Sequence, residues 1–145
     1  MPTRVARTEW SGGLMDGSGR TELVSSGLGA YEVSFPKRSA EDAAGATSPE
    51  ELIAAAHSAC YAMQLSAFLA DAGGKPERLE VTAEVSLGPD PAGGFRIPGI
   101  ALKVRGTVPG LDADGFAKAA EAAKAGCPVS KALAGTAITL DAALS

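Results

Sequence analysis

Cysteine and histidine are scarce in this sequence. Its 145 residues include two cysteines and one histidine, and no Cys-x-x-Cys motif occurs. These three residues cannot complete the usual four-ligand site of structural zinc. No motif supports Ser-His-Asp hydrolysis, and no glycine-rich phosphate loop joins a strand to a helix. We therefore expect neither a metal nor an organic cofactor.

Clusters of basic residues are also absent. The formal net charge is −4, which disfavours a nucleic acid or an anionic membrane as a partner. The first ten residues, MPTRVARTEW, lack the apolar core and cleavage site of a signal peptide, so we expect a cytoplasmic protein. In that reducing compartment, two cysteines are more often catalytic or inert than joined in a structural disulfide.

The longest uncharged stretch lies between Glu51 and Asp71 and predicts a long helix. Ser48 fits the N-cap and Glu51 stands at the capping-box spacing, while Gly73 suits the C-terminal end. Apolar residues leave this helix no polar face, so it belongs in a core or a membrane. Polar residues within it argue against a membrane span, and we expect a buried central helix wrapped by sheet: His57, Ser58, Gln64 and Ser66.

The remaining pattern predicts strands separated from helices. The expected order is βββ-α-ββ-α-α-β, which indicates an α+β fold in one domain over residues 1–145. A change of phase at Pro98 predicts one long strand with a β-bulge. Residues 37–47 are expected to form an irregular loop. The expected strands are 4–10, 21–26, 31–35, 79–87, 95–104 and 136–142, and two further helices are expected over 112–124 and 128–133.

The two cysteines occupy different local environments. Cys127 precedes Pro128 at the start of a short helix, where backbone N–H groups lower a thiol pKa. Cys60 lies among apolar residues, which raise its pKa unless a cation approaches. Local sequence therefore makes Cys127 the more activated thiol and leaves Cys60 open to an inert, buried role. His57, three residues before Cys60, could pair with it, but a histidine satisfied inside a packed helix is the better interpretation.

Glu50 has no structural role of its own, unlike Glu51 in the capping box. A buried carboxylate at this position would need a partner. Arg38, a short loop upstream, is the natural candidate, although a solvated cation is the simpler interpretation of that residue. Lys37 is a possible substitute.

Two motifs, TSPEELIAAAHSACYAM (47–63) and AGCPVSKAL (125–133), resemble the OsmC/Ohr family of thiol-dependent peroxidases. The Ala-Ala-His before the first cysteine and the CPVSKAL sequence resemble the OsmC branch. The C-terminal GTAITLDAAL fits as well, so the resemblance covers essentially the whole chain. It implies an antiparallel sheet around a long buried central helix, in an intertwined homodimer.

The resemblance also implies roles for four residues. Cys60 resembles the peroxidatic cysteine and Cys127 the resolving one, while Arg38 and Glu50 resemble the pair that holds the thiolate and orients the peroxide. An organic hydroperoxide would be the substrate, hydrogen peroxide a poorer one, and a dithiol of lipoyl type the reductant. These roles place the protein in oxidative and osmotic stress. They also reverse the local ranking of the two thiols, which a guanidinium near Cys60 could do.

Helix geometry constrains this interpretation. Ten residues of straight helix put Glu50 about 15 Å along the axis from Cys60. Either the helix breaks, or the Arg38–Glu50 pair comes from a second subunit, which we favour. Two other hypotheses remain. The protein could be a redox sensor or partner-binding protein that uses the same disulfide as a switch, or a structural homodimer with two inert cysteines.

Overall fold

The computed structural model describes all 145 residues, which form two compact units, residues 1–51 and residues 52–145. The expectation of one domain over residues 1–145 stays a prediction.

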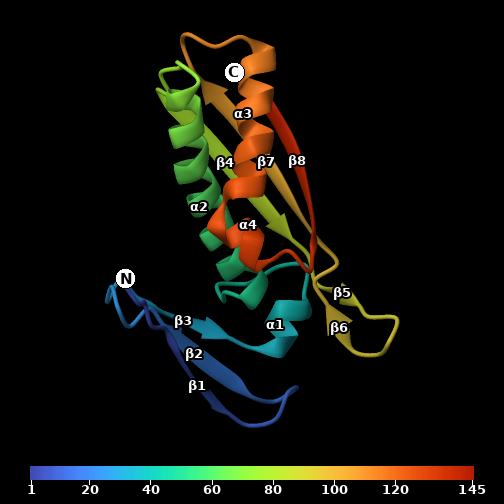
Figure 1. Ribbon diagram of the computed structural model, residues 1–145. Helices are drawn as coiled ribbons and strands as arrows, with labels where there is room; N and C mark the ends of the chain where they lie inside the picture. Colours follow the sequence, from blue (N-terminus) through green and yellow to red (C-terminus); the bar gives the residue numbers. More distant parts are fainter. The chain divides into compact units, whose positions relative to one another are not determined.

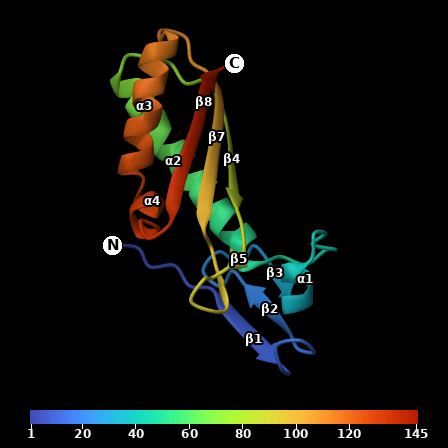
Figure 2. The ribbon, with the colours of Figure 1, turned by 90° about the vertical axis from the view of Figure 1, so that its right-hand side faces the viewer.

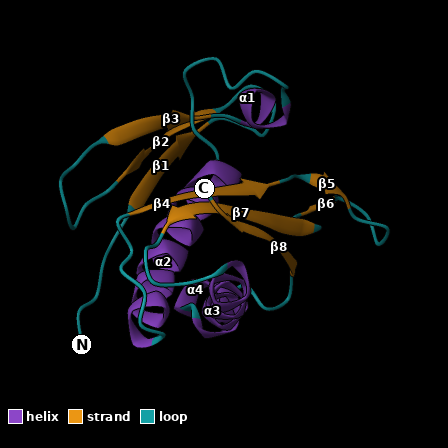
Figure 3. Cartoon of the chain, turned by 90° about the horizontal axis from the view of Figure 1, so that it is seen from above, coloured by secondary structure: helices purple, strands orange, loops and turns teal.

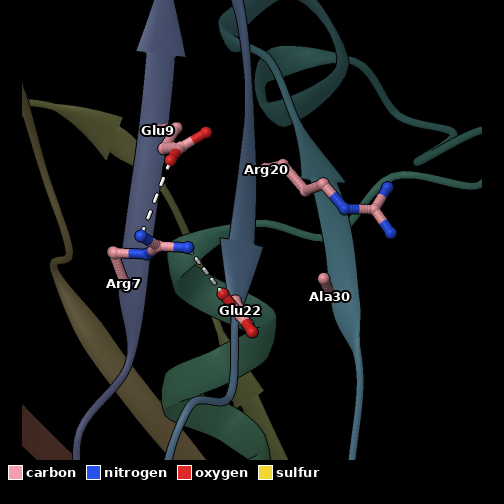
Figure 4. A pocket seen from close by; sticks show the side chains of 5 residues that line it. All are labelled: Arg7, Glu9, Arg20, Glu22 and Ala30. Atoms are coloured by element: carbon pink, nitrogen blue, oxygen red, sulfur yellow. Dashed lines mark hydrogen bonds and ion pairs between the residues drawn. The ribbon is translucent and has the colours of Figure 1, made fainter. Parts of the chain in front are cut away.

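The first unit is a small antiparallel sheet followed by a short helix (Figure 1). Strands β1 (Arg7–Ser11), β2 (Ser18–Glu22) and β3 (Ala30–Val33) pair in chain order. The turn between β1 and β2 closes where the Gly13 N–H donates to Asp16 Oδ1 at 2.8 Å. A shallow pocket on this sheet is lined by charged side chains and contains no nucleophile (Figure 4).

Helix α1 (Phe35–Ser39) occupies part of the segment expected to be irregular, so that expectation is wrong there. Ser34 is its N-cap and accepts from the Lys37 N–H at 3.4 Å, while Pro36 lies in the first turn, where it needs no N–H partner. β3 ends at Val33 and Phe35 is already helical, so the strand expected over residues 31–35 is too long, and Pro36 lies in the helix that follows. The consequence for the site is that Arg38 projects from a helix.

Helix α2 (Pro49–Asp71) confirms the expected central helix, with the predicted cap at its start. The Glu51 N–H donates to Ser48 Oγ at 3.1 Å. At the other end, Gly73 has a φ of 90°, and the Gly74 N–H donates to the Leu69 carbonyl at 2.9 Å. This left-handed closure is one that glycine adopts without the steric cost of a side chain.

The second unit packs helices against a three-stranded sheet of order β4-β7-β8. β4 (Arg78–Val85) and β7 (Gly99–Thr107) are antiparallel. β8 (Ala137–Leu144) runs parallel to β7, so this sheet is mixed. The parallel pairing follows from the crossover through α3 (Ala113–Gly126) and α4 (Pro128–Ala132), which returns the chain to the end where β7 began. α2 and α3 run side by side along the sheet (Figures 1 and 2), and α3 and α4 lie beneath its strands in Figure 3.

Only one stripe of α2 is fully buried within the chain. Its members recur every four residues and face the sheet and α3: His57, Tyr61, Leu65 and Leu69. The Met63 side chain, on another face, is 71% exposed. By length and composition α2 could cross a membrane, but the core helix of a soluble protein passes the same test, and this buried stripe makes α2 a core helix.

The strand expected over residues 95–104 is interrupted rather than bulged. β6 (Phe95–Arg96) pairs with β5 (Gly88–Pro89) in a separate two-stranded hairpin, and β7 begins only at Gly99. Pro98 has no N–H to donate to a ladder, so the backbone pairing stops there. The change of phase was a correct observation, but the bulge inferred from it is wrong.

Candidate functional site

The two cysteines, distant in sequence, meet in the second unit. The Cys127 and Cys60 sulfur atoms are 3.2 Å apart, and both cysteines are free. Cys127 is completely buried, whereas Cys60 is half-buried on α2. The arrangement leaves Cys60 as the thiol that a small solute can reach, with Cys127 directly behind it.

The corner between α3 and α4 holds Cys127 in place. Its N–H donates to the Ala123 carbonyl at 2.8 Å, and its own carbonyl accepts from the Lys131 N–H at 3.0 Å. Cys127 therefore ends one helix and begins the next, and the Cys-Pro sequence predicts the second of these roles. Gly126 lets this corner approach α2, because a Cβ there would lie 3.2 Å from the Phe68 ring.

A second tie between α2 and α3 lies one residue from Cys60. The Tyr61 side chain is completely buried, and its hydroxyl donates to the Ala120 carbonyl at 3.0 Å. Burial raises the pKa of Tyr61 far above its usual range, so the hydroxyl remains a donor at neutral pH. This hydrogen bond joins the helix that carries Cys60 to α3.

The surroundings separate the two thiols electrostatically. Burial raises the pKa of Cys60, and its contact with Cys127 raises it further, against the opposing N–H of Val129. Burial also acts to raise the pKa of Cys127, but the N–H of Ser130, the Cys60 thiol and the Ser130 hydroxyl together lower it below its usual value. Within one chain, Cys127 is thus the more acidic thiol, as its local sequence predicts. The Cys127 side chain makes no cap hydrogen bond. The N–H groups at the start of α4 therefore lower the pKa of Cys127 from a longer distance.

His57 is completely buried and bonds across to α4. Its Nε2 lies 2.7 Å from Ser130 Oγ, while Nδ1 has no hydrogen-bond partner. Burial lowers the pKa of His57, so the ring is neutral at pH 7. The expected histidine in a packed helix is present, but only one of its two ring nitrogen atoms has a hydrogen-bond partner. Sequence reasoning did not identify Ser130, because nothing local links it to a residue 73 positions upstream.

The Arg38–Glu50 ion pair predicted from the sequence is present in the first unit. Arg38 Nη2 donates to Glu50 Oε1 at 2.7 Å, and Nε lies 3.1 Å from both carboxylate oxygens. Burial acts to raise the pKa of Glu50, but the Arg38 hydrogen bonds and charge lower it overall. Lys37 instead pairs with Glu32 at 3.0 Å on an exposed surface, so it does not substitute for Arg38 in this contact. No group of three or more His, Cys, Asp or Glu side chains could hold a metal ion.

Comparisons with known proteins agree on one family. Residues 41–142 match the model of the family described as OsmC-like protein. The chain is 43% identical to peroxiredoxin OsmC of Escherichia coli over 138 residues, which covers 95% of this chain and 94% of that protein. An organic hydroperoxide resistance protein from Elizabethkingia anophelis has 28% identity and a TM-score of 0.80, covering 100% of this chain and 98% of that one. OhrB of Bacillus subtilis has 28% identity and a TM-score of 0.72, with coverages of 97% and 98%.

Proposed function

The chain belongs to the OsmC family, and we propose that it is a thiol-dependent peroxidase that reduces organic hydroperoxides, and hydrogen peroxide less well. The observation that carries the proposal is the 3.2 Å separation of the Cys60 and Cys127 sulfur atoms. The names of its relatives, a peroxiredoxin and organic hydroperoxide resistance proteins, support the same activity.

The chemistry needs two steps on sulfur. The Cys60 thiolate attacks one peroxide oxygen, the O–O bond breaks, and the alkoxide leaves and takes up a proton as an alcohol. Cys60 is then a sulfenic acid. The Cys127 thiolate attacks its sulfur, forming a disulfide while hydroxide leaves as water, and a dithiol later reduces the disulfide by exchange. With the sulfurs 3.2 Å apart, the second step requires little movement of either helix.

The first step requires a thiolate at Cys60, whose pKa is raised within the single chain. A guanidinium beside the sulfur would reverse that preference. α2 has no break between Pro49 and Asp71, so Glu50 of the same chain lies about 15 Å along the axis from Cys60. We therefore assign this role to the Arg38–Glu50 pair of a second subunit in a homodimer. The exposed Met63 face of α2 supports an additional partner of this kind.

The preferred peroxide and reductant follow from the surroundings of Cys60. Cys60 packs against the apolar core, and apolar surroundings favour an alkyl group over a small polar peroxide. The proposed reductant is a dithiol of lipoyl type, and the proposed location is the cytoplasm, where such dithiols and reduced cysteines persist.

Single-turnover oxidation tests the proposal. The reduced protein is mixed with cumene hydroperoxide or hydrogen peroxide, and free thiols are counted after quenching. We expect two thiols to be lost per chain, much faster with the organic peroxide. Thiols that persist, or react equally slowly with both peroxides, would contradict it. Adding dihydrolipoamide then separates an enzyme, which turns over repeatedly, from a redox switch, which is oxidised once.

A further inference from the structure

One buried polar contact has no role in the chemistry described so far. His57 on α2 and Ser130 on α4 join at 2.7 Å, and each lies three residues from one of the two cysteines in sequence. Both side chains are buried, with exposures of 0% and 6%. A buried histidine that only fills space could be replaced by an apolar residue without the cost of desolvating a ring. The contact therefore calls for a functional explanation.

The unpaired Nδ1 atom decides which way the hydrogen bond runs. If Nδ1 carried the proton, a buried N–H would lack any acceptor, and orphaned buried N–H groups are rare. With the proton on Nε2, only a lone pair stays unpaired. Nε2–H then donates to Ser130 Oγ, and the hydroxyl proton of Ser130 must point elsewhere.

The Cys127 sulfur is the acceptor we consider for this hydroxyl proton. Cys127 is the N-cap of α4 and Ser130 stands three residues later, the spacing at which a side chain reaches back toward the cap. The Ser130 hydroxyl and the backbone N–H of the same residue both act to lower the pKa of Cys127. Three titratable groups of α2 surround this point: Cys60, His57 and Tyr61.

We propose that His57 and Ser130 are positioning residues that aim a hydroxyl proton at Cys127 Sγ and so prepare Cys127 to resolve oxidised Cys60. The inference rests on the proposed peroxidase function. In the resolving step, the Cys127 thiolate forms the S–S bond, the S–O bond of the Cys60 sulfenic acid breaks, and the leaving hydroxide takes a proton from solvent. Neither His57 nor Ser130 gains or loses a proton.

Stopped-flow oxidation of the full chain by cumene hydroperoxide tests the inference in Ser130→Ala. Sulfenic acid formation and disulfide formation are followed separately, by dimedone trapping and by thiol counting. Because the variant lacks the hydroxyl that the proposal directs at the Cys127 thiolate, we expect disulfide formation to slow at least about tenfold. Formation of the sulfenic acid should not slow in Ser130→Ala. A Cys127 thiolate that is less stabilised leaves more of the negative charge of the thiol pair on Cys60. The inference would be overturned if sulfenic acid formation and disulfide formation slowed equally, or if neither step slowed.

Replacing the ring tests the direction of the hydrogen bond. In His57→Gln the side-chain amide can still donate to Ser130, so we expect disulfide formation within about twofold of the parent rate. In His57→Leu it should slow as in Ser130→Ala. If disulfide formation slowed equally in His57→Gln and His57→Leu, a donor role for His57 would be contradicted. Ser66→Ala serves as the matched control, because it removes an exposed hydroxyl of α2 that bonds only to the Met63 carbonyl.

A measurement without peroxide separates this inference from the proposed function. The reduced protein is alkylated with iodoacetamide across a pH range, and each cysteine is quantified by mass spectrometry. We expect the apparent pKa of Cys127 to rise in Ser130→Ala and His57→Leu, and to stay at the parent value in His57→Gln and Ser66→Ala. An unchanged Cys127 profile in Ser130→Ala would overturn the inference even in an active peroxidase. A changed profile in a protein inert to peroxides would contradict only the proposed function.

Discussion

The sulfur atoms of Cys60 and Cys127 lie 3.2 Å apart although 67 residues separate them in the chain. A long helix carries one, and the corner between two shorter helices carries the other. The outer thiol can meet a solute, and the inner one can meet only the outer one. These positions agree with the proposed roles, in which peroxide oxidises Cys60 and Cys127 resolves the product.

Removing each cysteine should separate the two chemical steps. Cys60→Ser should lose peroxide consumption entirely, because Cys127 is completely buried behind it. Cys127→Ser should still form one sulfenic acid per chain and then stop, because the resolving thiol is missing. Dimedone labelling followed by mass spectrometry of the intact protein measures both outcomes. Full peroxide consumption by Cys60→Ser would reverse the assigned roles.

Loss of Arg38 should affect both stability and peroxide reduction. Glu50 is 7% exposed, so Arg38→Met leaves a largely buried carboxylate without its partner. Because the Arg38 side chain is partly exposed, we expect destabilisation of about 1–3 kcal/mol, below the loss for a fully buried pair. Urea unfolding measures this change, and initial rates should fall at least about tenfold as the Cys60 thiolate loses its cation.

Lys37→Met provides the matched control for Arg38→Met. The Lys37–Glu32 pair is exposed, so its loss should cost less than about 1 kcal/mol. Peroxide reduction should remain near the parent rate. If the two variants lost activity equally, the effect would reflect general surface charge rather than the Arg38–Glu50 pair.

His57 should make the protein less stable in mild acid. Burial lowers its pKa in the folded state below the value of 6.5 expected for the unfolded chain. Between those two pKa values the unfolded chain binds more protons than the folded chain does. The contribution of neutral His57 to folding stability is therefore complete above pH 6.5 and is lost as pH falls toward the folded pKa. Within this window the free energy of unfolding should fall by at most about 1.4 kcal/mol per pH unit.

Urea unfolding of the reduced protein between pH 5 and 8 checks this expectation. His57→Gln cannot titrate in that range, so its stability should vary less with pH than that of the parent protein. Identical pH dependence in both proteins would contradict a buried, neutral His57.

Tyr61→Phe should test the tie between α2 and α3 apart from the thiols. The substitution removes the hydroxyl that donates to the Ala120 carbonyl and leaves the buried ring in place. We expect destabilisation of about 0.5–1.5 kcal/mol, the usual net contribution of one hydrogen bond. Thermal unfolding measures the change, and the initial rate of Cys60 oxidation should stay within about twofold. A larger loss of rate at unchanged stability would give Tyr61 a chemical role.

Local signals in the sequence determined much of this protein. Ser48 and Glu51 predicted where α2 begins, and Gly73 predicted where it ends, because caps act within a few residues of the helix terminus. The Cys127-Pro128 step predicted the start of α4 and the more acidic thiol within one chain. The need of a buried carboxylate for a partner made Arg38 a candidate for Glu50, but local sequence favoured a solvated Arg38, and the structure decided for the pair.

The tertiary structure alone decided the rest. The crossover through α3 and α4 made β8 parallel to β7, and Pro98 interrupted a strand that alternation had suggested was continuous. The approach of Cys127 to Cys60, and of Ser130 to His57, joins residues 67 and 73 positions apart. Such contacts depend on how helices pack across a shared core, and periodicity along one segment carries no information about which distant side chain will face it.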